Sequence, residues 1–410
     1  MNKYIKKPEV LSPAGDMECL RAAVDFGADA VYLAGKQFGM RAAPSNFDEA
    51  GMKEAVSYAH GKNVRVYVTC NTMPRSGELS ELPDFLRSCE AAGADGLIIA
   101  DLGVLAAAKK HVPDLPLHIS TQMGVVNYGA ALALHEMGAS RVVLARELSL
   151  EEIAEIRRNT PAELEIECFV HGAMCMSFSG RCLLSNYMTG RDANRGGCAQ
   201  PCRWEYELIE KKRPDQSFAI EQDDQGSFIF NARDLNMIEY LPQLSGAGVS
   251  SLKIEGRAKS AYYVASVTSA YRRAVDFYAE NPGKPLPEDI LSEPEKISHR
   301  EYSTGFYMGG EPGQNTKSGG YIRDYEVVAV CTGTENGLVR LKQRNRFFKN
   351  AAADVLQPSG KVISISLDEI YNEDMEQIEA APHAEMTVYL KTDINVETGA
   401  YFRVRRNGSL

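Results

Sequence analysis

The sequence predicts an α/β fold, a (β/α)8 barrel of the TIM-like kind, followed by a small all-β domain. Short β-branched runs alternate eight times with helical stretches between residues 9 and 254. Four cysteines cluster at residues 175–202, after the seventh of these runs, and a segment rich in proline and glycine begins near Asn281. Eight successive β-α units favour a closed barrel over an open doubly wound sheet.

Length and composition agree with this division. The chain has 410 residues, more than one hydrophobic core usually organises, so one large and one smaller domain are expected. No run approaches the ~18 apolar residues of a membrane span, and no apolar segment follows the charged N-terminus. We therefore expect a cytoplasmic protein with no membrane association. The net charge of −10 argues against a chain coated in nucleic acid, although a local basic surface remains compatible with it.

The barrel strands are expected where β-branched residues gather between turn and helix signals. Asp16 can cap a helix that begins with MECL, and Gly93 can end the helix that contains FLRSCEAAG. The first strand leads into SPAGD rather than G-x-G-x-x-G, which counts against a dinucleotide-binding fold. The eight predicted strands are 9–12, 29–33, 64–69, 96–100, 117–120, 141–145, 165–170 and 252–254.

Polar residues stand where these strands end, which is where such barrels place their active sites. In the motif KIEGR, Lys253, Glu255 and Arg257 alternate after the last strand and would face the barrel mouth. For each residue alone, an ion pair or a helix cap is the competing interpretation. Their shared location favours an active site. The other strand-end residues are Ser12, Asn71, Asp101, Gln122, Arg146, Glu147 and His171.

The domain boundaries follow the changes in composition. The barrel is expected at residues 1–285, with a cysteine-rich insertion at 171–250. Residues 286–325 are interpreted as a linker, and residues 326–410 as a small β-barrel domain of short alternating strands.

A basic run within the second domain has period two. On a strand its four cations would share one face, beside Phe347 and Phe348. This face is a candidate RNA-backbone surface with stacking aromatics, and a charge-protected edge strand is the alternative. The cations are Arg340, Lys342, Arg344 and Arg346.

The clustered cysteines follow the spacing C-x6-C-x15-C-x3-C. In a reducing compartment, such a cluster indicates metal or redox chemistry rather than disulfides. Zinc sites usually contain two C-x2–4-C pairs, and only Cys198 and Cys202 fit one. Irregular spacing suits an iron–sulfur cluster, and four inert buried thiols are the alternative. The other two cysteines of the cluster are Cys175 and Cys182.

Residues 167–185, ECFVHGAMCMSFSGRCLLS, fit the pattern E-x-F-x-x-G-[SA]-hydrophobic-C-x4-G-x-C-x-hydrophobic-S. With LSPAGDMECLRAAVDFGADAVYLAG, STQMGVVN, GGCAQPCRW, SLKIEGRAKS and STGF, they span most of the barrel. The chain thereby resembles the collagenase-like peptidase family of unknown catalytic type, peptidase family U thirty-two. Its C-terminal domain is similar to the extension of the subgroup that modifies transfer RNA (tRNA).

The resemblance implies two competing functions. One is an iron–sulfur-dependent, oxygen-independent tRNA hydroxylase that forms 5-hydroxyuridine at the wobble position with prephenate. The other is a collagenase-like peptidase. A peptidase needs an activated nucleophile, a zinc-bound water or paired carboxylates. The sequence has no H-E-x-x-H and no G-x-S-x-G, and Cys175 near His171 is its one evident cysteine–histidine dyad. The hydroxylase is therefore favoured.

Under this interpretation, Cys175, Cys182, Cys198 and Cys202 hold a [4Fe–4S] cluster, as the resemblance implies. Fixed cations would bind the dicarboxylate prephenate, since guanidinium groups suit carboxylates. The expected partners are tRNA and this small dicarboxylate, and a related partner subunit is compatible with the resemblance. The proposed substrate-binding residues are Arg257, Lys253, Arg181, Arg146 and Gln122, and the proposed catalytic residues are Glu255, His171 and Glu167.

Overall fold

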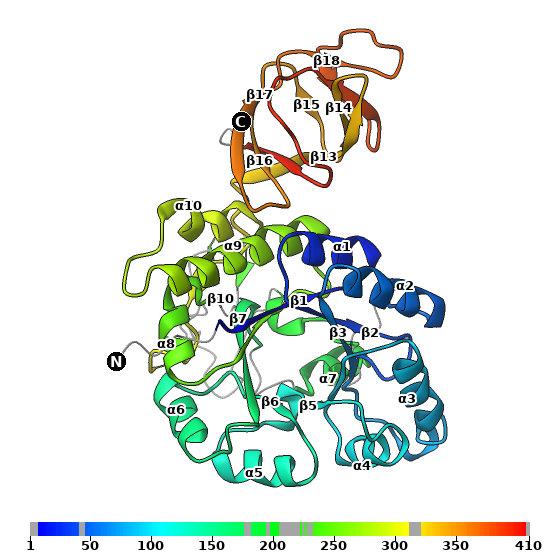
Figure 1. Ribbon diagram of the computed structural model, residues 1–410, viewed down its shortest axis with the longest axis vertical. Coiled ribbons are helices and arrows are strands. Elements are labelled where there is room, and N and C mark those ends of the chain that lie inside the picture. The colour runs from blue at the N-terminus through cyan, green and yellow to red at the C-terminus, as the bar shows by residue number, and fades with distance from the viewer. Residues whose placement is uncertain are drawn as a thin grey trace, which may run out of the picture.

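The computed structural model describes residues 7–40, 46–175, 182–193, 197–204, 222–223, 226–227, 233–310 and 321–406. Within these ranges, eight parallel strands close into a barrel ringed by helices, and a second sheet packs beside it (Figure 1). The predicted barrel is confirmed.

Each barrel strand pairs in parallel with the next, and the last strand pairs with both the seventh and the first to close the ring. Every strand has a mostly buried burial pattern, because helices cover the outside and side chains fill the inside. The strands are β1 (Glu9–Pro13), β2 (Ala30–Ala34), β3 (Arg65–Cys70), β4 (Gly96–Ile99), β5 (Leu117–Ile119), β6 (Arg141–Val143), β7 (Glu165–Ala173) and β11 (Ser251–Ile254).

The surrounding helices begin at polar caps. The side chain of Asp16 accepts a hydrogen bond from the Cys19 amide at 2.8 Å, as predicted, and Gly93 follows α3 with a φ of 85°. None of the helices in the described ranges has the length and hydropathy needed to span a lipid bilayer. The helices are α1 (Met17–Asp25), α2 (Glu49–His60), α3 (Leu82–Ala91), α4 (Leu102–His111), α5 (Tyr128–Glu136), α6 (Leu150–Arg158), α7 (Leu184–Thr189), α8 (Leu241–Gly246), α9 (Ala261–Glu280) and α10 (Glu288–Leu291).

Residues 233–310 belong to the barrel more closely than the sequence indicated. Strand β10 (Asp234–Asn236) pairs antiparallel with β7, and β12 (Tyr302–Ser303) pairs with β10. Helix α10 and the 3-10 helix η7 (Glu293–Lys296) pack on α9. The end of the expected insertion is therefore barrel wall, and the first half of the expected linker is packed, with Glu293 and Ile297 buried.

The C-terminal domain is an antiparallel sheet around its own apolar core, which includes Val328, Leu341 and Phe402. Among residues 321–406 the sheet order is β17-β16-β21-β13-β14-β20-β18, so it forms a half-barrel rather than the expected compact barrel. Its strands are β13 (Tyr325–Glu335), β14 (Leu338–Gln343), β16 (Ala352–Leu356), β17 (Val362–Ser366), β18 (Ile370–Tyr371), β20 (Thr387–Leu390) and β21 (Tyr401–Arg405), and β15 (Phe347–Phe348) pairs separately with β19 (Ala380–Ala381).

The second domain is anchored to the barrel helices α1 and α9 (Figure 1). Arg403 of β21 forms two contacts with Glu293, at 2.5 and 2.8 Å, and both side chains are fully buried. Tyr401 packs against the barrel core, and Arg344 reaches Glu18 of α1 at 2.5 Å. Separating a buried ion pair leaves each charge buried without its partner, which is costly, so these contacts fix the orientation of the domain relative to the barrel.

Candidate active site

A cavity of about 130 Å³ opens at the C-terminal ends of the barrel strands. Its lining contains residues from β2, β3, β4, β7 and β11 and from the loops after β3, β5, β6 and β11. The structure brings together five of the predicted site residues here: Gln122, Arg146, Lys253, Glu255 and Arg257. Asn71, another predicted strand-end residue, also lines it, whereas Tyr32, Thr69 and Phe169 were missed by sequence reasoning.

A larger cavity, of about 640 Å³, lies at the opposite end of the barrel. Its charged lining residues pair with one another or with neighbours: Arg272 contacts Asp29 at 2.9 Å, and Arg65 contacts Glu9. In barrels of this kind the N-terminal end of the strands serves stability, and the C-terminal end carries the chemistry. We therefore take the smaller cavity as the candidate active site.

The side chain of Lys253 is held in place by residues of the barrel interior. Its Nζ lies 2.7 Å from Oε1 of Glu167 and 4.6 Å from the centroid of the Tyr32 ring. Glu167 itself is fully buried in the barrel interior and is not among the residues that line the cavity. Glu167 is thus a support for Lys253 rather than a residue facing the cavity.

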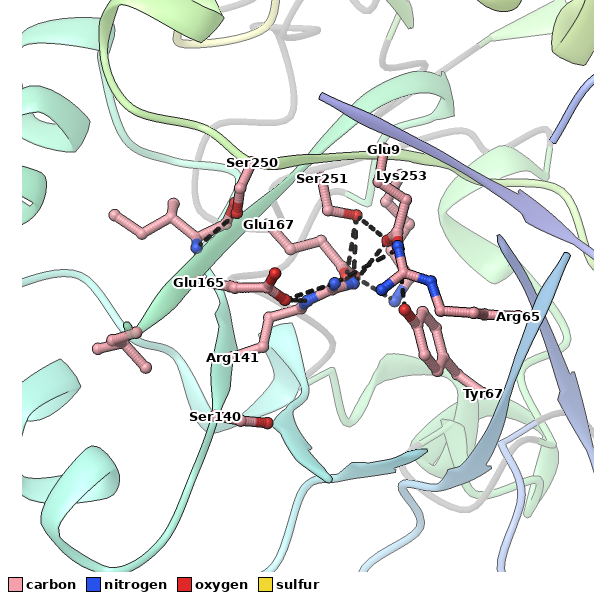
Figure 2. A network of polar contacts seen from close by, with 12 residues as sticks. Glu9, Arg65, Tyr67, Ser140, Arg141, Glu165, Glu167, Ser250, Ser251 and Lys253 are labelled. Carbon is pink, nitrogen blue, oxygen red and sulfur yellow. Dashed lines mark hydrogen bonds and ion pairs between the residues drawn. The ribbon is translucent and has the colours of Figure 1, made fainter. Parts of the chain in front are cut away.

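Figure 2 shows how the support continues across the barrel through Arg141, which extends between Glu9, Glu165 and Glu167. Arg141 contacts these carboxylates at 2.7, 2.6 and 2.9 Å respectively. With Lys253, five side chains meet in this network, because the parallel strands β1, β6, β7 and β11 that carry them all begin at the same end of the barrel. Two cations and three carboxylates are joined here, and Arg65 at Glu9 balances the charge.

Burial and charge decide the protonation of this network. Burial alone would raise the pKa of Glu9, but the guanidinium groups of Arg141 and Arg65 outweigh it and hold the pKa below its usual range. Burial, together with Arg141 and Lys253, pushes the pKa of His118 well below its usual value, so this interior histidine stays neutral. The barrel floor is therefore a charged but balanced layer beneath the cavity.

The two arginines of the cavity are oriented by polar acceptors. Arg257 donates to Oδ1 of Asn46 at 2.9 Å and to Oγ1 of Thr69 at 3.3 Å. Arg146 donates to the backbone oxygen of Ala173 at 2.9 Å, and its guanidinium lies 4.6 Å from the centroid of Phe169. These contacts fix both guanidinium groups at the mouth of the barrel.

Two glycines let the KIEGR loop approach its neighbours. A Cβ at Gly15, in the motif SPAGD, would lie 2.1 Å from the backbone oxygen of Arg257. Gly172 has a φ of 105°, and a Cβ there would lie 2.6 Å from the backbone oxygen of Glu255. Both positions therefore require glycine if Glu255 and Arg257 are to reach the cavity.

Four predicted strand-end residues do not line the cavity: Ser12, Asp101, Glu147 and His171. His171 is buried among the rings of Tyr263, Tyr271 and Tyr302 and does not line the cavity; burial lowers its pKa to about 3. This corrects its expected position at the barrel mouth. Ser12 is buried against Thr268 at 2.6 Å, and Asp101 caps α4.

The nine cysteines fall into two groups. Cys175 and Cys198 are exposed, and Cys182 and Cys202 are half-buried. The other five are buried, and burial raises their thiol pKa, for Cys19 and Cys89 to about 12. Only the four predicted ligands are therefore accessible. The buried five are Cys19, Cys70, Cys89, Cys168 and Cys331.

Backbone amides point at two of the accessible thiols. The amide of Leu184 donates to Sγ of Cys182 at 3.4 Å, and that of Gln200 donates to Sγ of Cys198 at 3.3 Å. Helix α7 contacts the 3-10 helix η5 (Pro201–Arg203), which carries Cys202. Amide donors of this kind stabilise thiolates, so the donor chemistry fits a thiolate-bound cluster.

Even so, no three His, Cys, Asp or Glu side chains gather as a ligand set in the part of the chain that the structure describes. The four cysteines therefore stay a predicted cluster site. Arg181, the remaining predicted substrate-binding residue, lies outside the described residues.

The basic run is only partly a free cationic face. On β14, Val339 and Leu341 are buried while Arg340 and Lys342 point outward, as the period predicted. Acidic residues pair with three of the four cations: Glu335 with Arg340 at 3.7 Å, and Glu385 with both Lys342 and Arg344. Arg346 is exposed and lies 4.7 Å from the Phe348 ring centroid.

A closed parallel barrel, a cavity lined by three cations at the C-terminal ends of its strands, and four accessible thiols define a (β/α)8-barrel protein with a candidate active site at the barrel mouth. Residues 15–317 match the profile of Peptidase family U32, and residues 323–403 match that of the Peptidase family U32 C-terminal domain. The chain belongs to this family.

Its relatives include proteins similar over nearly their whole length. The chain is 36% identical over 393 residues to tRNA hydroxylation protein P1 of Bacillus subtilis, covering 95% of this chain and 92% of the relative. It is 35% identical to tRNA hydroxylation protein P of Escherichia coli, covering 98% and 97%. The 23S rRNA 5-hydroxycytidine C2501 synthase of E. coli is 38% identical over 67% of this chain and 40% of the relative.

Proposed function

We propose that this protein is an iron–sulfur-dependent, oxygen-independent hydroxylase that forms 5-hydroxyuridine at the wobble position of tRNA, with prephenate as co-substrate. One observation carries the proposal: Arg146, Lys253 and Arg257 converge on one cavity at the catalytic end of the barrel. The names of the two nearly full-length relatives, which refer to tRNA hydroxylation, point to the same reaction class.

The cavity suits a small dicarboxylate. Guanidinium groups bind carboxylates through two parallel hydrogen bonds, and the hydrogen bonds of Arg257 and Arg146 hold both groups in the lining. Lys253 adds a point charge whose position is set by Glu167. Two carboxylates of one ligand would thus meet separate cations, which orients the ligand in the mouth.

Proton transfer falls to Glu255. Among the described residues that line the cavity, it is the one carboxylate, and it follows directly after β11. A general acid or base must lie within hydrogen-bond reach of the reacting group, and a cavity-lining carboxylate meets that condition. His171 does not, because it is enclosed by tyrosines outside the cavity.

The four accessible cysteines are the residues that would hold the [4Fe–4S] cluster. When bound, such a cluster would supply one-electron redox chemistry. The residues of the barrel bind and orient the dicarboxylate and move a proton at Glu255.

A peptidase remains the second candidate because the family is named for that activity. The cavity offers hydroxyls from Ser120 and Thr121, but the described residues that line it include no histidine or cysteine. The Cys175–His171 dyad considered from sequence loses support, because a buried imidazole with a pKa of about 3 is a weak base.

One preparation can test both functions. Protein purified without oxygen is incubated in parallel with prephenate and unmodified tRNA, and with denatured collagen. We expect 5-hydroxyuridine in the nucleoside digest and no release of peptides. Release of peptides at a rate that persists after removal of iron, without any hydroxylated uridine, would overturn the proposal in favour of the peptidase.

A further inference from the structure

A groove of about 420 Å³ lies where the barrel meets the C-terminal domain. The start of α9 and the loop before it form one side, and β13, the loop after β14 and the end of β21 form the other. We call this feature the junction groove. Six of its polar and aromatic lining residues matter here: Lys259, Tyr321, Arg323, Tyr325, Asn345 and Arg406.

The junction groove is cationic in a chain of net charge −10. Its lining has three cations and one carboxylate, Glu326, which pairs with Arg406 at 3.1 Å. In the described ranges, neither Lys259 nor Arg323 forms an ion pair. The groove thus offers two cations whose charge no described carboxylate offsets.

The ring of Tyr321 holds these two cations in position. Lys259 and Arg323 lie 5.0 and 5.8 Å from the centroid of Tyr321, and the buried Arg300 lies 5.0 Å from the same centroid. Arg300 also donates to the Tyr321 hydroxyl at 3.1 Å. Cation–π contacts of this kind hold long side chains in place, so less freedom is lost when an anion binds.

The groove joins two features already described. Lys259 follows Arg257 of the active-site cavity by two residues, so their Cα atoms are at most about 7.6 Å apart. At the other side, Asn345 precedes Arg346, which lies against the 52%-exposed Phe348. A polyanionic strand in the groove could therefore extend from the barrel mouth to this exposed arginine.

The cations on and just after β14 are less suited to binding a polyanion than those of the junction groove. Lys342 and Arg344 share the carboxylate of Glu385, and Arg344 also contacts Glu18 of the barrel. A phosphate would have to displace these acidic partners, whereas Lys259 and Arg323 need no such exchange among the described residues.

We propose that the junction groove binds the phosphate backbone of a single-stranded segment of tRNA and presents a neighbouring nucleotide to the barrel cavity. The inference rests on the proposed function, which supplies tRNA as the substrate. Phosphates match the groove in charge, and the position beside the cavity matches a substrate that must enter the mouth. The groove, more than the β14 face, is then the RNA-binding surface.

The test compares two variants with equal changes in charge. The groove variant carries Lys259→Gln, Arg323→Gln and Arg406→Gln. The control variant carries Arg21→Gln, Lys53→Gln and Lys110→Gln, three exposed cations on the outer helices α1, α2 and α4. Affinity for tRNA is measured at several salt concentrations.

For a single strand, each phosphate that the protein no longer neutralises lowers the slope of log affinity against log salt by about 0.7. We therefore expect the slope of the groove variant to be smaller by about 1.4 from Lys259 and Arg323, and by about 2 where Arg406 also exchanges Glu326 for a phosphate. We also expect its affinity at low salt to fall at least about tenfold, while the control variant keeps the wild-type slope. Prephenate affinity should be unchanged in both, which reports an intact barrel.

The outcomes separate the two proposals. If the wild type hydroxylates tRNA and the groove variant binds it with unchanged affinity and slope, the groove inference fails alone. If the wild type neither binds nor modifies tRNA, the proposed function fails. Should the variant not fold, hydrogen exchange of the wild type decides: tRNA should protect residues 258–263 and 321–327, and no protection would overturn the groove. Equal binding of polyglutamate at matched ionic strength would assign the groove to an acidic protein instead.

Discussion

Replacing Glu167 with Gln should destabilise the barrel and loosen Lys253. Gln keeps the volume of the side chain and removes only its charge, which contacts Lys253 at 2.7 Å and Arg141 at 2.9 Å in a fully buried position. Removing one partner of a buried ion pair costs about 3–5 kcal/mol, because the remaining charge stays buried without compensation. The free energy of unfolding in urea, followed by circular dichroism, measures this loss.

Glu165→Gln is the matched control. Glu165 lies on the same strand and contacts the same Arg141 at 2.6 Å, but its side chain is 40% exposed. Solvent screens the half-exposed Glu165 carboxylate, and the buried Arg141 keeps its contacts with Glu9 and Glu167, so this variant should lose only about 1 kcal/mol. Substitutions at ordinary surface positions change the free energy of unfolding by up to about 0.5 kcal/mol. If the two variants differ by less than this, the ion-pair network does not support Lys253 as described.

Three further variants probe the cavity, the cysteines and the barrel floor. Arg257→Gln should weaken prephenate binding by about 10–100-fold, since charge-assisted hydrogen bonds contribute about 1.5–3 kcal/mol, and calorimetry that finds unchanged affinity would remove Arg257 from the site. Cys198→Ser should abolish the iron content of protein prepared without oxygen, whereas the buried Cys331→Ser should retain it; equal iron in both variants would exclude Cys198 as a ligand. The folded-state pKa of Glu9 lies below its ordinary value of 4.5, so its contribution to the free energy of unfolding is present above that pH and is lost as pH falls through the folded pKa. Glu9→Gln should therefore flatten the acid side of the plot of unfolding free energy against pH. An unchanged plot would contradict the lowered pKa.

Strand ends were the most informative part of the sequence. Gln122, Arg146, Lys253, Glu255 and Arg257 were identified because parallel strands in a barrel all end at one mouth, and the structure places these five around one cavity. Their individual chemical roles stay predictions.

Other site residues could not be predicted in the same way. Every position of β2 is buried, so the sequence does not reveal that Tyr32 faces inward. His171 stands at the end of a predicted strand, but the sequence does not show which side of the strand its side chain faces. It could face the barrel mouth or, as the structure has it, the tyrosines packed outside β7.

The charge network beneath the cavity does have a signal in the sequence. Glu9, Arg65, Arg141 and Glu165 are the first residues of four strands. Since parallel strands begin at one end, charged first residues should meet there, and their opposite signs predict pairing. The contacts between the domains had no such signal, because Glu293 lies in a 3-10 helix and Arg403 lies within a strand of another sheet, so no shared strand end brings them together.

The proposed function requires the cationic cavity to support prephenate-dependent hydroxylation of tRNA. Its most direct test is the yield of 5-hydroxyuridine, measured by mass spectrometry of digested tRNA after strictly anaerobic incubation, as a function of prephenate concentration. We predict saturable formation by the wild type and, for Arg257→Lys, saturation only at about tenfold higher prephenate, because Lys cannot replace a bidentate guanidinium. Hydroxylation that is independent of prephenate, or identical concentration dependence in the two proteins, would contradict the claim.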